Sequence, residues 1–157
     1  MEKIESFRVD HTRLFPGLYV SRRDGGDEKP VTTFDLRITR PNEEPVMDMP
    51  AIHTMEHLGA TFLRNSEQKG DIIYFGPMGC RTGFYLIMRD AASHQQTLDL
   101  VKAAFAFAAD FDGEIPGAKQ IECGNYLEHD LPGAKAEAAA YVRVLENVTP
   151  DTLVYPE

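Results

Sequence analysis

Basic residues are scarce in this sequence, and long hydrophobic runs are missing. Its 157 residues include 16 Lys and Arg against 25 Asp and Glu, so the formal net charge is −9. This charge argues against a nucleic-acid partner, because binding to a phosphate backbone needs a basic surface. No apolar stretch reaches the length of about 18 residues that a membrane-spanning helix requires. We therefore expect neither nucleic acid nor a membrane as a partner.

Cysteine is rare as well, with only Cys80 and Cys123 in the chain. The N-terminal segment MEKIESFRVDHTR lacks the apolar core of a secretion signal, so we expect a cytoplasmic protein. Because cytosolic cysteines seldom form disulfides, the two thiols are expected to act as ligands or catalysts. The sequence has no internal repeat and no glycine-rich phosphate-binding loop. Its length fits a single domain over residues 1–157 with a core of its own.

The hydrophobic pattern predicts an α+β fold. We expect strands at residues 18–23, 31–40, 71–77 and 83–89, and helices at about 50–66, 94–110 and 132–146. Apolar and polar residues alternate within 31–40, which is typical of a half-buried strand. A capping box, Ser93 with Gln96, opens the second helix. Because strands and helices do not alternate regularly, this order favours a mostly antiparallel sheet with helices packed on one face.

The segment Ile52-His53-Thr54-Met55-Glu56-His57-Leu58 carries a metal-binding pattern. On a helix, His53 and His57 lie one turn apart and about 40° from each other, so both imidazoles can reach one ion. Glu56 lies beside both and is placed to move protons rather than to bind the ion. The H-x-x-E-H order is that of the inverted zincins. A solvated helix face that happens to carry these residues is the alternative interpretation.

The two cysteines have different surroundings in the sequence. Cys123, in the segment 118–130 where at most a short helical turn is expected, is the best candidate for a third ligand. A thiolate suits Zn or Fe(II) and would leave a fourth position open; alternatively Cys123 is a small buried hydrophobe. Cys80 lies in the turn Gly-Pro-Met-Gly-Cys-Arg-Thr-Gly. There we expect an exposed thiol whose pKa is lowered by the adjacent Arg81, which makes Cys80 a candidate catalyst.

Several motifs occur together in a characteristic order. They are Ser6-Phe7 with Asp10-His11, Phe34-Asp35-Leu36-Arg37, the H-x-x-E-H segment, Pro77-Met78-Gly79-Cys80-Arg81-Thr82-Gly83, Cys123-Gly124 and His129-Asp130-Leu131. With these motifs the chain closely resembles the S-ribosylhomocysteine lyases, the LuxS family of autoinducer-2 production. The resemblance implies a homodimeric enzyme with one divalent metal per subunit, Fe(II) in cells and Zn or Co as substitutes. It also implies cleavage of S-ribosylhomocysteine to homocysteine and 4,5-dihydroxy-2,3-pentanedione.

The same resemblance assigns roles to individual residues. His53, His57 and Cys123 match metal ligands, Glu56 and Cys80 match the acid/base pair, and Ser6, His11 and Arg37 match positions near the ribose. Arg64, roughly 16 Å along the helix axis from His53, is expected at the homocysteine end. The family places its sites at a two-fold interface, so we expect Ser6 and His11 to reach the metal of the partner chain. Tyr74-Phe75-Gly76 stands where the family often has an acidic residue, so no role of a carboxylate transfers there.

Two other functions fit the metal pattern. The first is a small inverted-zincin hydrolase in which Glu56 activates a metal-bound water. The second is an interaction module built on a structural metal, because structural zinc sites are closed by four protein ligands. His129, His94 or Cys80 could provide the fourth ligand in that case. Peptide cleavage would distinguish the first alternative, and the number of protein ligands would distinguish the second.

Overall fold

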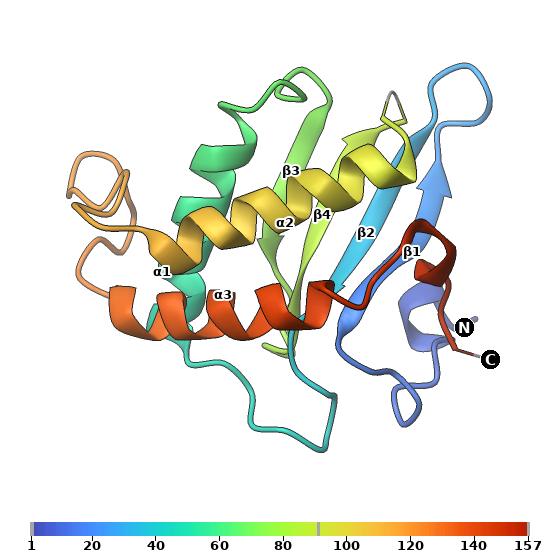
Figure 1. Cartoon of the computed structure of the whole chain (residues 1–157), viewed down its shortest axis with the longest axis horizontal. Coiled ribbons are helices and arrows are strands. Elements are labelled where there is room, and N and C mark those ends of the chain that lie inside the picture. The colour runs from blue at the N-terminus through green and yellow to red at the C-terminus, as the bar shows by residue number, and fades with distance from the viewer. Residues whose placement is uncertain (1, 91, 157) are drawn as a thin grey trace.

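The computed structural model describes residues 2–90 and 92–156, and its four longest strands form one antiparallel sheet in the order β1-β2-β4-β3 (Figure 1). The strands are β1 (Gly17–Asp24), β2 (Val31–Arg37), β3 (Ile72–Pro77) and β4 (Gly83–Arg89). The helices are α1 (Met49–Leu63), α2 (His94–Asp110) and α3 (Leu131–Leu145), with short 3-10 turns η1 (Glu5–Phe7) and η2 (Pro150–Thr152). The predicted α+β class with an antiparallel sheet is confirmed.

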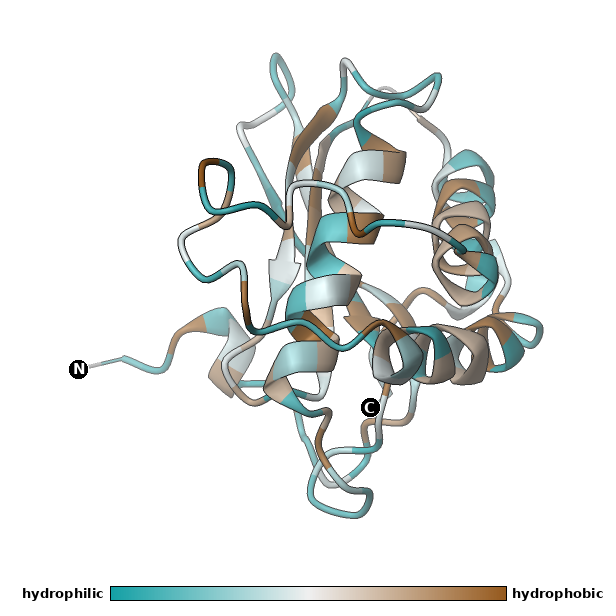
Figure 2. Cartoon of the chain, turned by 90° about the vertical axis from the view of Figure 1, so that its left-hand side faces the viewer, coloured by the Kyte–Doolittle hydropathy of each residue, from teal (hydrophilic) through white to brown (hydrophobic). Residues whose placement is uncertain are grey.

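The core lies between one face of the sheet and the three helices. Phe34 and Leu36 on β2 and Phe84 and Leu86 on β4 point to this face and are buried with apolar residues of all three helices. Figure 2 shows the apolar residues mainly where helices and strands face one another, whereas the connecting loops are largely polar. Burial of these alternating side chains therefore determines which face of the sheet the helices cover.

Helix α1 approaches β3 closely because residue 59 has no side chain. A Cβ at Gly59 would overlap the ring of Phe75, which itself stacks on Phe84 in the core. The apolar face of α1 is buried, including Ile52 and Met55. Its histidine-bearing face consequently points away from the sheet, toward the long segment that connects α2 and α3.

Two element ends differ from the prediction by more than one residue. The strand expected over 31–40 ends at Arg37, because the backbone amides of Ile38 and Thr39 both donate to the carbonyl of Thr82. The helix expected to reach residue 66 ends at Leu63, where the carbonyl accepts the side-chain hydroxyl of Ser66 at 2.7 Å. Such local bonds compete with the helical ladder. Residues 118–130 form turns and no helix.

Toward the end of β2 its polar face is buried too, although its alternation predicted a half-buried strand. Asp35 and Arg37 are 1% and 2% exposed and form an ion pair at 2.6 Å. The C-terminal segment covers them: the hydroxyl of Tyr155 donates to Asp35 at 2.8 Å, and the carbonyl of Leu153 accepts the amide of Val20. The sequence pattern of one strand does not reveal that another segment will cover it.

Within the described part of the chain, every helix is too short or too polar to cross a bilayer.

Candidate metal centre

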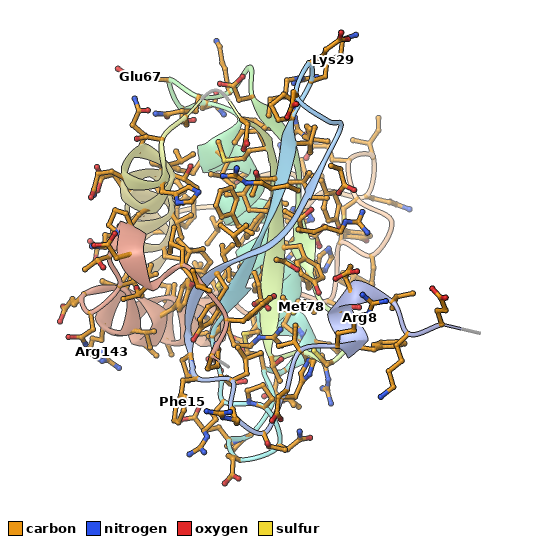
Figure 3. The ribbon with its side chains drawn as sticks, turned by 90° about the vertical axis from the view of Figure 1, so that its right-hand side faces the viewer. Arg8, Phe15, Lys29, Glu67, Met78 and Arg143 are labelled. Carbon is orange, nitrogen blue, oxygen red and sulfur yellow. The ribbon has the colours of Figure 1, made fainter. Side chains whose placement is uncertain are left out.

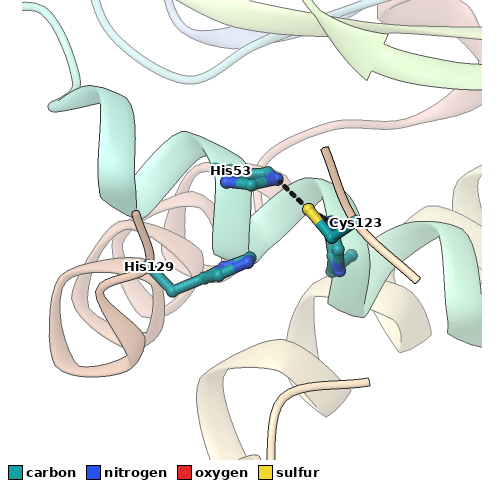
Figure 4. A group of neighbouring side chains, drawn as sticks. His53, Cys123 and His129 are labelled. Atoms are coloured by element: carbon teal, nitrogen blue, oxygen red, sulfur yellow. Dashed lines mark hydrogen bonds between the residues drawn. The ribbon is translucent and has the colours of Figure 1, made fainter. Parts of the chain in front are cut away.

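Helix α1 and the segment between α2 and α3 bring four ligand-type side chains together. His53 and His57 come from α1, and Cys123 and His129 come from the segment that leads into α3 (Figure 4). One nitrogen or sulfur atom of each residue lies within 4.8 Å of the corresponding atoms of the other three. The cluster therefore joins residues about 70 positions apart, as the sequence motifs required.

Backbone carbonyls orient the two histidines of α1. His53 Nδ1 lies 2.8 Å from the carbonyl oxygen of Glu128, and His57 Nδ1 lies 2.7 Å from that of Pro116. A carbonyl can only accept, so both Nδ1 atoms carry a proton, and in the neutral rings both Nε2 atoms keep a free lone pair. This arrangement is the usual outer support of metal-binding histidines. Gly117 makes it possible, because its φ is +70° and its Cβ would lie 3.3 Å from His57 Nδ1.

The spacing of the first three donor atoms fits a metal ion. Cys123 Sγ lies 3.4 Å from His53 Nε2 and 3.8 Å from His57 Nε2. Tetrahedral coordination with ordinary metal–sulfur and metal–nitrogen bonds separates such atoms by roughly 3.6 Å. The backbone amide of Asn125 also donates to the sulfur at 3.4 Å and helps to fix its position. Two imidazole lone pairs and a thiolate form a donor set suited to Zn or Fe(II).

His129 is the fourth member of the cluster. Its ring stacks on that of His53 with centroids 4.0 Å apart, and its Nδ1 lies 3.0 Å from the hydroxyl of Thr54. Burial lowers the pKa of His129, and the nearby His53 and His57 lower it further, because their protonated forms would repel a positive charge on His129. Its Nε2 is buried and has no hydrogen-bond partner among the described residues. Of the three candidates for a fourth ligand, His94 and Cys80 lie elsewhere.

Glu56 is half-buried on the same helix face, at the edge of the cluster. It lines a pocket of about 230 Å³ together with His53, Pro77 and Asn125. A carboxylate there could exchange protons with a molecule held in the pocket, next to the metal ligands.

Cys80 lines a second pocket of about 230 Å³, which it shares with His11 and Thr82. The thiol is exposed, as expected, and its sulfur lies 3.1 Å from the hydroxyl of Thr82. Partial burial raises the pKa of Cys80, but the hydrogen bonds with Thr82 and the charge of Arg37 outweigh it and lower the pKa overall. Arg37 donates to Thr82 at 2.7 Å and lies 3.9 Å from the sulfur.

Comparison with known proteins now decides the family. The profile described as S-ribosylhomocysteinase (LuxS) matches residues 4–151. This chain belongs to the LuxS family. It is 50% identical over 157 residues to the S-ribosylhomocysteine lyase of Finegoldia magna, with both chains fully covered. It is 51% identical over 158 residues to that of Clostridium acetobutylicum, again with full coverage, and 51% identical to that of Phocaeicola vulgatus, covering 99% of this chain and 98% of the relative.

Membership of the LuxS family confirms the predicted enzyme class, a lyase. It also favours this class over the hydrolase and the structural-metal module. The predicted group of metal-ligand residues is found together in the structure, and a metal cofactor agrees with the family. One detail of the prediction is wrong: the cation beside Cys80 is Arg37, not Arg81. The backbone of Arg81 has φ +62°, and its guanidinium lies 3.5 Å from the carbonyl of Met47.

The remaining predicted residues of this LuxS-family chain lie farther from the metal cluster. Ser6, on η1, lines a pocket of about 260 Å³ with Tyr74 and Tyr85, on the sheet face opposite the helices. Figure 3 shows η1, marked by Arg8, to one side of the strands. Arg64 is the C-cap residue of α1 and donates to the carbonyl of Ile73 at 3.1 Å.

Sequence reasoning missed the groups that orient the histidines. The carbonyls of Pro116 and Glu128 carry no side-chain signature, so no motif could identify them. Thr54 lies inside the H-x-x-E-H segment, but its role as the partner of His129 depends on where the distant segment folds. The one signal available in the sequence was the glycine at position 117. Its backbone is left-handed in the structure, a conformation that glycine adopts readily.

Proposed function

We propose that this LuxS-family chain cleaves the thioether of S-ribosylhomocysteine. The products would be homocysteine and 4,5-dihydroxy-2,3-pentanedione, the precursor of autoinducer-2. One observation carries the proposal: a His-His-Cys cluster with metal-ligand spacing lies beside a carboxylate, in a chain about half identical to proteins that bear the lyase name. The substrate is a small molecule, in agreement with pockets of a few hundred Å³.

The reaction needs no redox cofactor. A thioether sulfur is a poor leaving group unless a neighbouring carbon bears an acidic proton. Moving the sugar carbonyl from C1 to C2 and then to C3 creates that acidity. The sulfur then leaves by β-elimination. Each carbonyl shift takes a proton from one carbon and returns it to the neighbouring carbon, while a hydroxyl proton moves between their two oxygens, so hydrogen is conserved within the substrate.

The proposed roles divide between the ligand cluster and two acid/base groups. His53, His57 and Cys123 hold a divalent metal, which supplies Lewis-acid stabilisation of the sugar oxygens. Glu56 and Cys80 take protons from carbon and return them, each contributing about 10²–10⁴ in rate. The lowered pKa of Cys80 increases the share of thiolate at a given pH. Ser6, His11, Arg37 and Arg64 are proposed to bind the substrate.

We propose Fe(II) as the metal in the cell, with Zn or Co as stable substitutes. The mixed imidazole and thiolate donor set accommodates all three ions, so availability and not affinity selects among them. Both cysteines are free thiols in the structure, in keeping with a reducing, cytoplasmic location. The core contains residues of every long strand and helix, which supports a single lyase domain over residues 1–157.

We further propose a homodimer whose active sites combine residues of two chains. Within one chain, the pocket of Glu56 and the pocket of Cys80 share none of their lining residues. Tyr74 and Tyr85 on the sheet face opposite the helices form a surface that a second chain could cover. Because Cys80 and His11 line one pocket, we expect one chain to provide both to the metal of its partner.

Mixing two inactive variants tests this sharing. His57→Ala and Cys80→Ala proteins are combined under conditions that allow subunits to exchange. If the two groups of residues come from different chains, each mixed dimer contains one intact site, and random pairing restores roughly a quarter of wild-type activity. If both groups come from one chain, every site keeps a defect and mixing restores nothing.

The decisive experiment for the lyase itself is thiol release. Purified protein, loaded anaerobically with Fe(II) or Co(II), is incubated with S-ribosylhomocysteine, and the released thiol is titrated. Stoichiometric homocysteine is expected from the wild type and none from Glu56→Gln, which keeps its shape but loses the proton-accepting charge. Absence of thiol from the metal-loaded wild type would refute the proposal, and cleavage of peptides by the same preparation would favour the hydrolase.

A further inference from the structure

One buried polar atom in the metal centre is left without a partner. Among the described residues, only two buried side-chain nitrogen or oxygen atoms have no hydrogen bond, and one of them is His129 Nε2. Buried polar atoms are nearly always paired, so such an atom points to a ligand or a water that completes the site. Figure 4 shows the ring of His129 alongside that of His53, on the side where Cys123 also lies.

The hydrogen bonds of Thr54 favour one position for the proton on the ring of His129. The hydroxyl oxygen of Thr54 accepts the backbone amide of Asp130 at 2.9 Å and lies 3.0 Å from His129 Nδ1. A threonine hydroxyl has one hydrogen to donate, and Nδ1 is its available acceptor. Donation to Nδ1 leaves the proton of the neutral ring on Nε2. His129 thus differs from His53 and His57, whose Nδ1 atoms donate to carbonyls.

We infer that His129 is a hydrogen-bond donor to the oxygen or anion that occupies the open metal position, and not a fourth ligand. A protonated Nε2 has no lone pair for a metal, whereas the Nε2 atoms of His53 and His57 do. The site then keeps three protein ligands and one exchangeable position, as catalytic sites do. The inference deepens the proposed function and rests on it, because the oxygen in question would be that of the substrate sugar.

The contacts of His129 suit this role. Stacking against His53 and the bond to Thr54 hold its ring on two sides. A donor held in this way needs no rearrangement when negative charge develops on a sugar oxygen, and loss of one such donor typically lowers kcat by about 10²–10³-fold. The group would assist both carbonyl shifts without taking up a proton.

Azide binding to the Co(II) protein tests the inference without turnover. Azide is a small anion that can enter an open metal position, and Co(II) reports its coordination by visible absorption. The variants are His129→Gln, whose amide can reach the place of Nε2, His129→Asn, whose amide reaches only the place of Nδ1, and His129→Phe, which keeps the stacking. His94→Phe, a histidine outside the cluster, is the matched control.

The expected result has three parts. Azide changes the spectrum of the wild type, since a position is open. All variants keep one Co(II) per chain and the thiolate-to-cobalt absorption, since their three ligands remain. Azide affinity falls roughly tenfold in His129→Phe and His129→Asn, falls less in His129→Gln, and is unchanged in His94→Phe.

The opposite pattern overturns the inference. If azide leaves the wild-type spectrum unchanged while every His129 variant loses Co(II) affinity and changes spectrum, His129 is a fourth ligand. If azide binds all proteins equally, the donor role is wrong. Thiol release from S-ribosylhomocysteine by the wild type is measured in parallel. If the wild type releases no thiol, the proposed function is refuted. The azide result still tests whether His129 is a hydrogen-bond donor.

Discussion

The two thiols of this chain lie in regions built in different ways. Cys80 lies in the tight turn between β3 and β4. Its neighbours Arg37, the last residue of β2, and Thr82, just before β4, lie at the same end of the sheet. Cys123 lies in a helix-free segment, and its neighbours are the imidazoles of α1. A cation and a hydroxyl stabilise a thiolate that is free to exchange protons, whereas two imidazole lone pairs and a thiolate form a metal-ligand set. The surroundings, and not the thiol, therefore favour acid/base chemistry at Cys80 and metal ligation at Cys123.

Removing each sulfur in turn is expected to have the largest effect and tests whether the two thiols differ in role. Cys123→Ala is expected to lose most of its metal, because one of three ligands disappears. Cys80→Ala is expected to keep its metal and fold while activity falls by about 10²–10⁴. Metal content per chain and thiol-release rates measure both effects. Normal metal content in both variants would show that Cys123 is not a ligand.

The buried ion pair beneath Cys80 offers a second test. Asp35→Asn leaves the guanidinium of Arg37 buried without its counter-charge and is expected to lower the free energy of unfolding by about 3–5 kcal/mol. Asp24→Asn, which breaks an exposed pair with Arg22, is the control and should cost less than about 1 kcal/mol. Urea unfolding measures both. Equal small losses would show that the buried pair does not support the Cys80 region.

The pH dependence of Cys80 sharpens the comparison further. Hydrogen bonds with Thr82 lower the pKa of Cys80, so Thr82→Val should raise it. A higher pKa leaves less thiolate at pH 7, and the alkylation rate there should fall several-fold while the rate at high pH stays unchanged. Site-resolved mass spectrometry after iodoacetamide treatment of the Zn-loaded protein follows Cys80 separately from Cys123. An unshifted profile would mean that Arg37 alone sets the pKa.

The smallest expected effect concerns the C-terminal segment. Tyr155→Phe removes one donor to Asp35 but leaves the ring stacked on Tyr19. Because the acceptor keeps both of its bonds from Arg37, the loss of unfolding free energy should be about 1 kcal/mol. Urea unfolding at neutral pH provides the measurement. A loss as large as that of Asp35→Asn would make Tyr155, and not Arg37, the main partner of the carboxylate.

Hydrophobic periodicity and capping residues predicted the elements well where the hydrogen bonds that bound an element come from nearby residues. The strand 83–89 and the helix 94–110 match the structure, and the Ser93–Gln96 capping box is present. Prediction failed at residues 38–40, where the carbonyl of Thr82 from the turn between β3 and β4 ends the strand. It also failed at residues 64–66, where side chains compete for the last carbonyls of the helix. Those ends depend on particular bonding partners rather than on the periodicity of the segment.

The sequence by itself determined which groups could meet at the metal centre. Because His53 and His57 are four residues apart, a helix places their imidazoles on one face, and this holds wherever the helix packs. Tertiary structure alone decided that Arg37 and not Arg81 faces Cys80, and that Nδ1 of His53 and His57 meets carbonyls while that of His129 meets a hydroxyl. These outcomes depend on how distant segments pack. The partner of a hydrogen-bonding group is set by which atoms lie within bonding distance, and the residue type alone does not determine that.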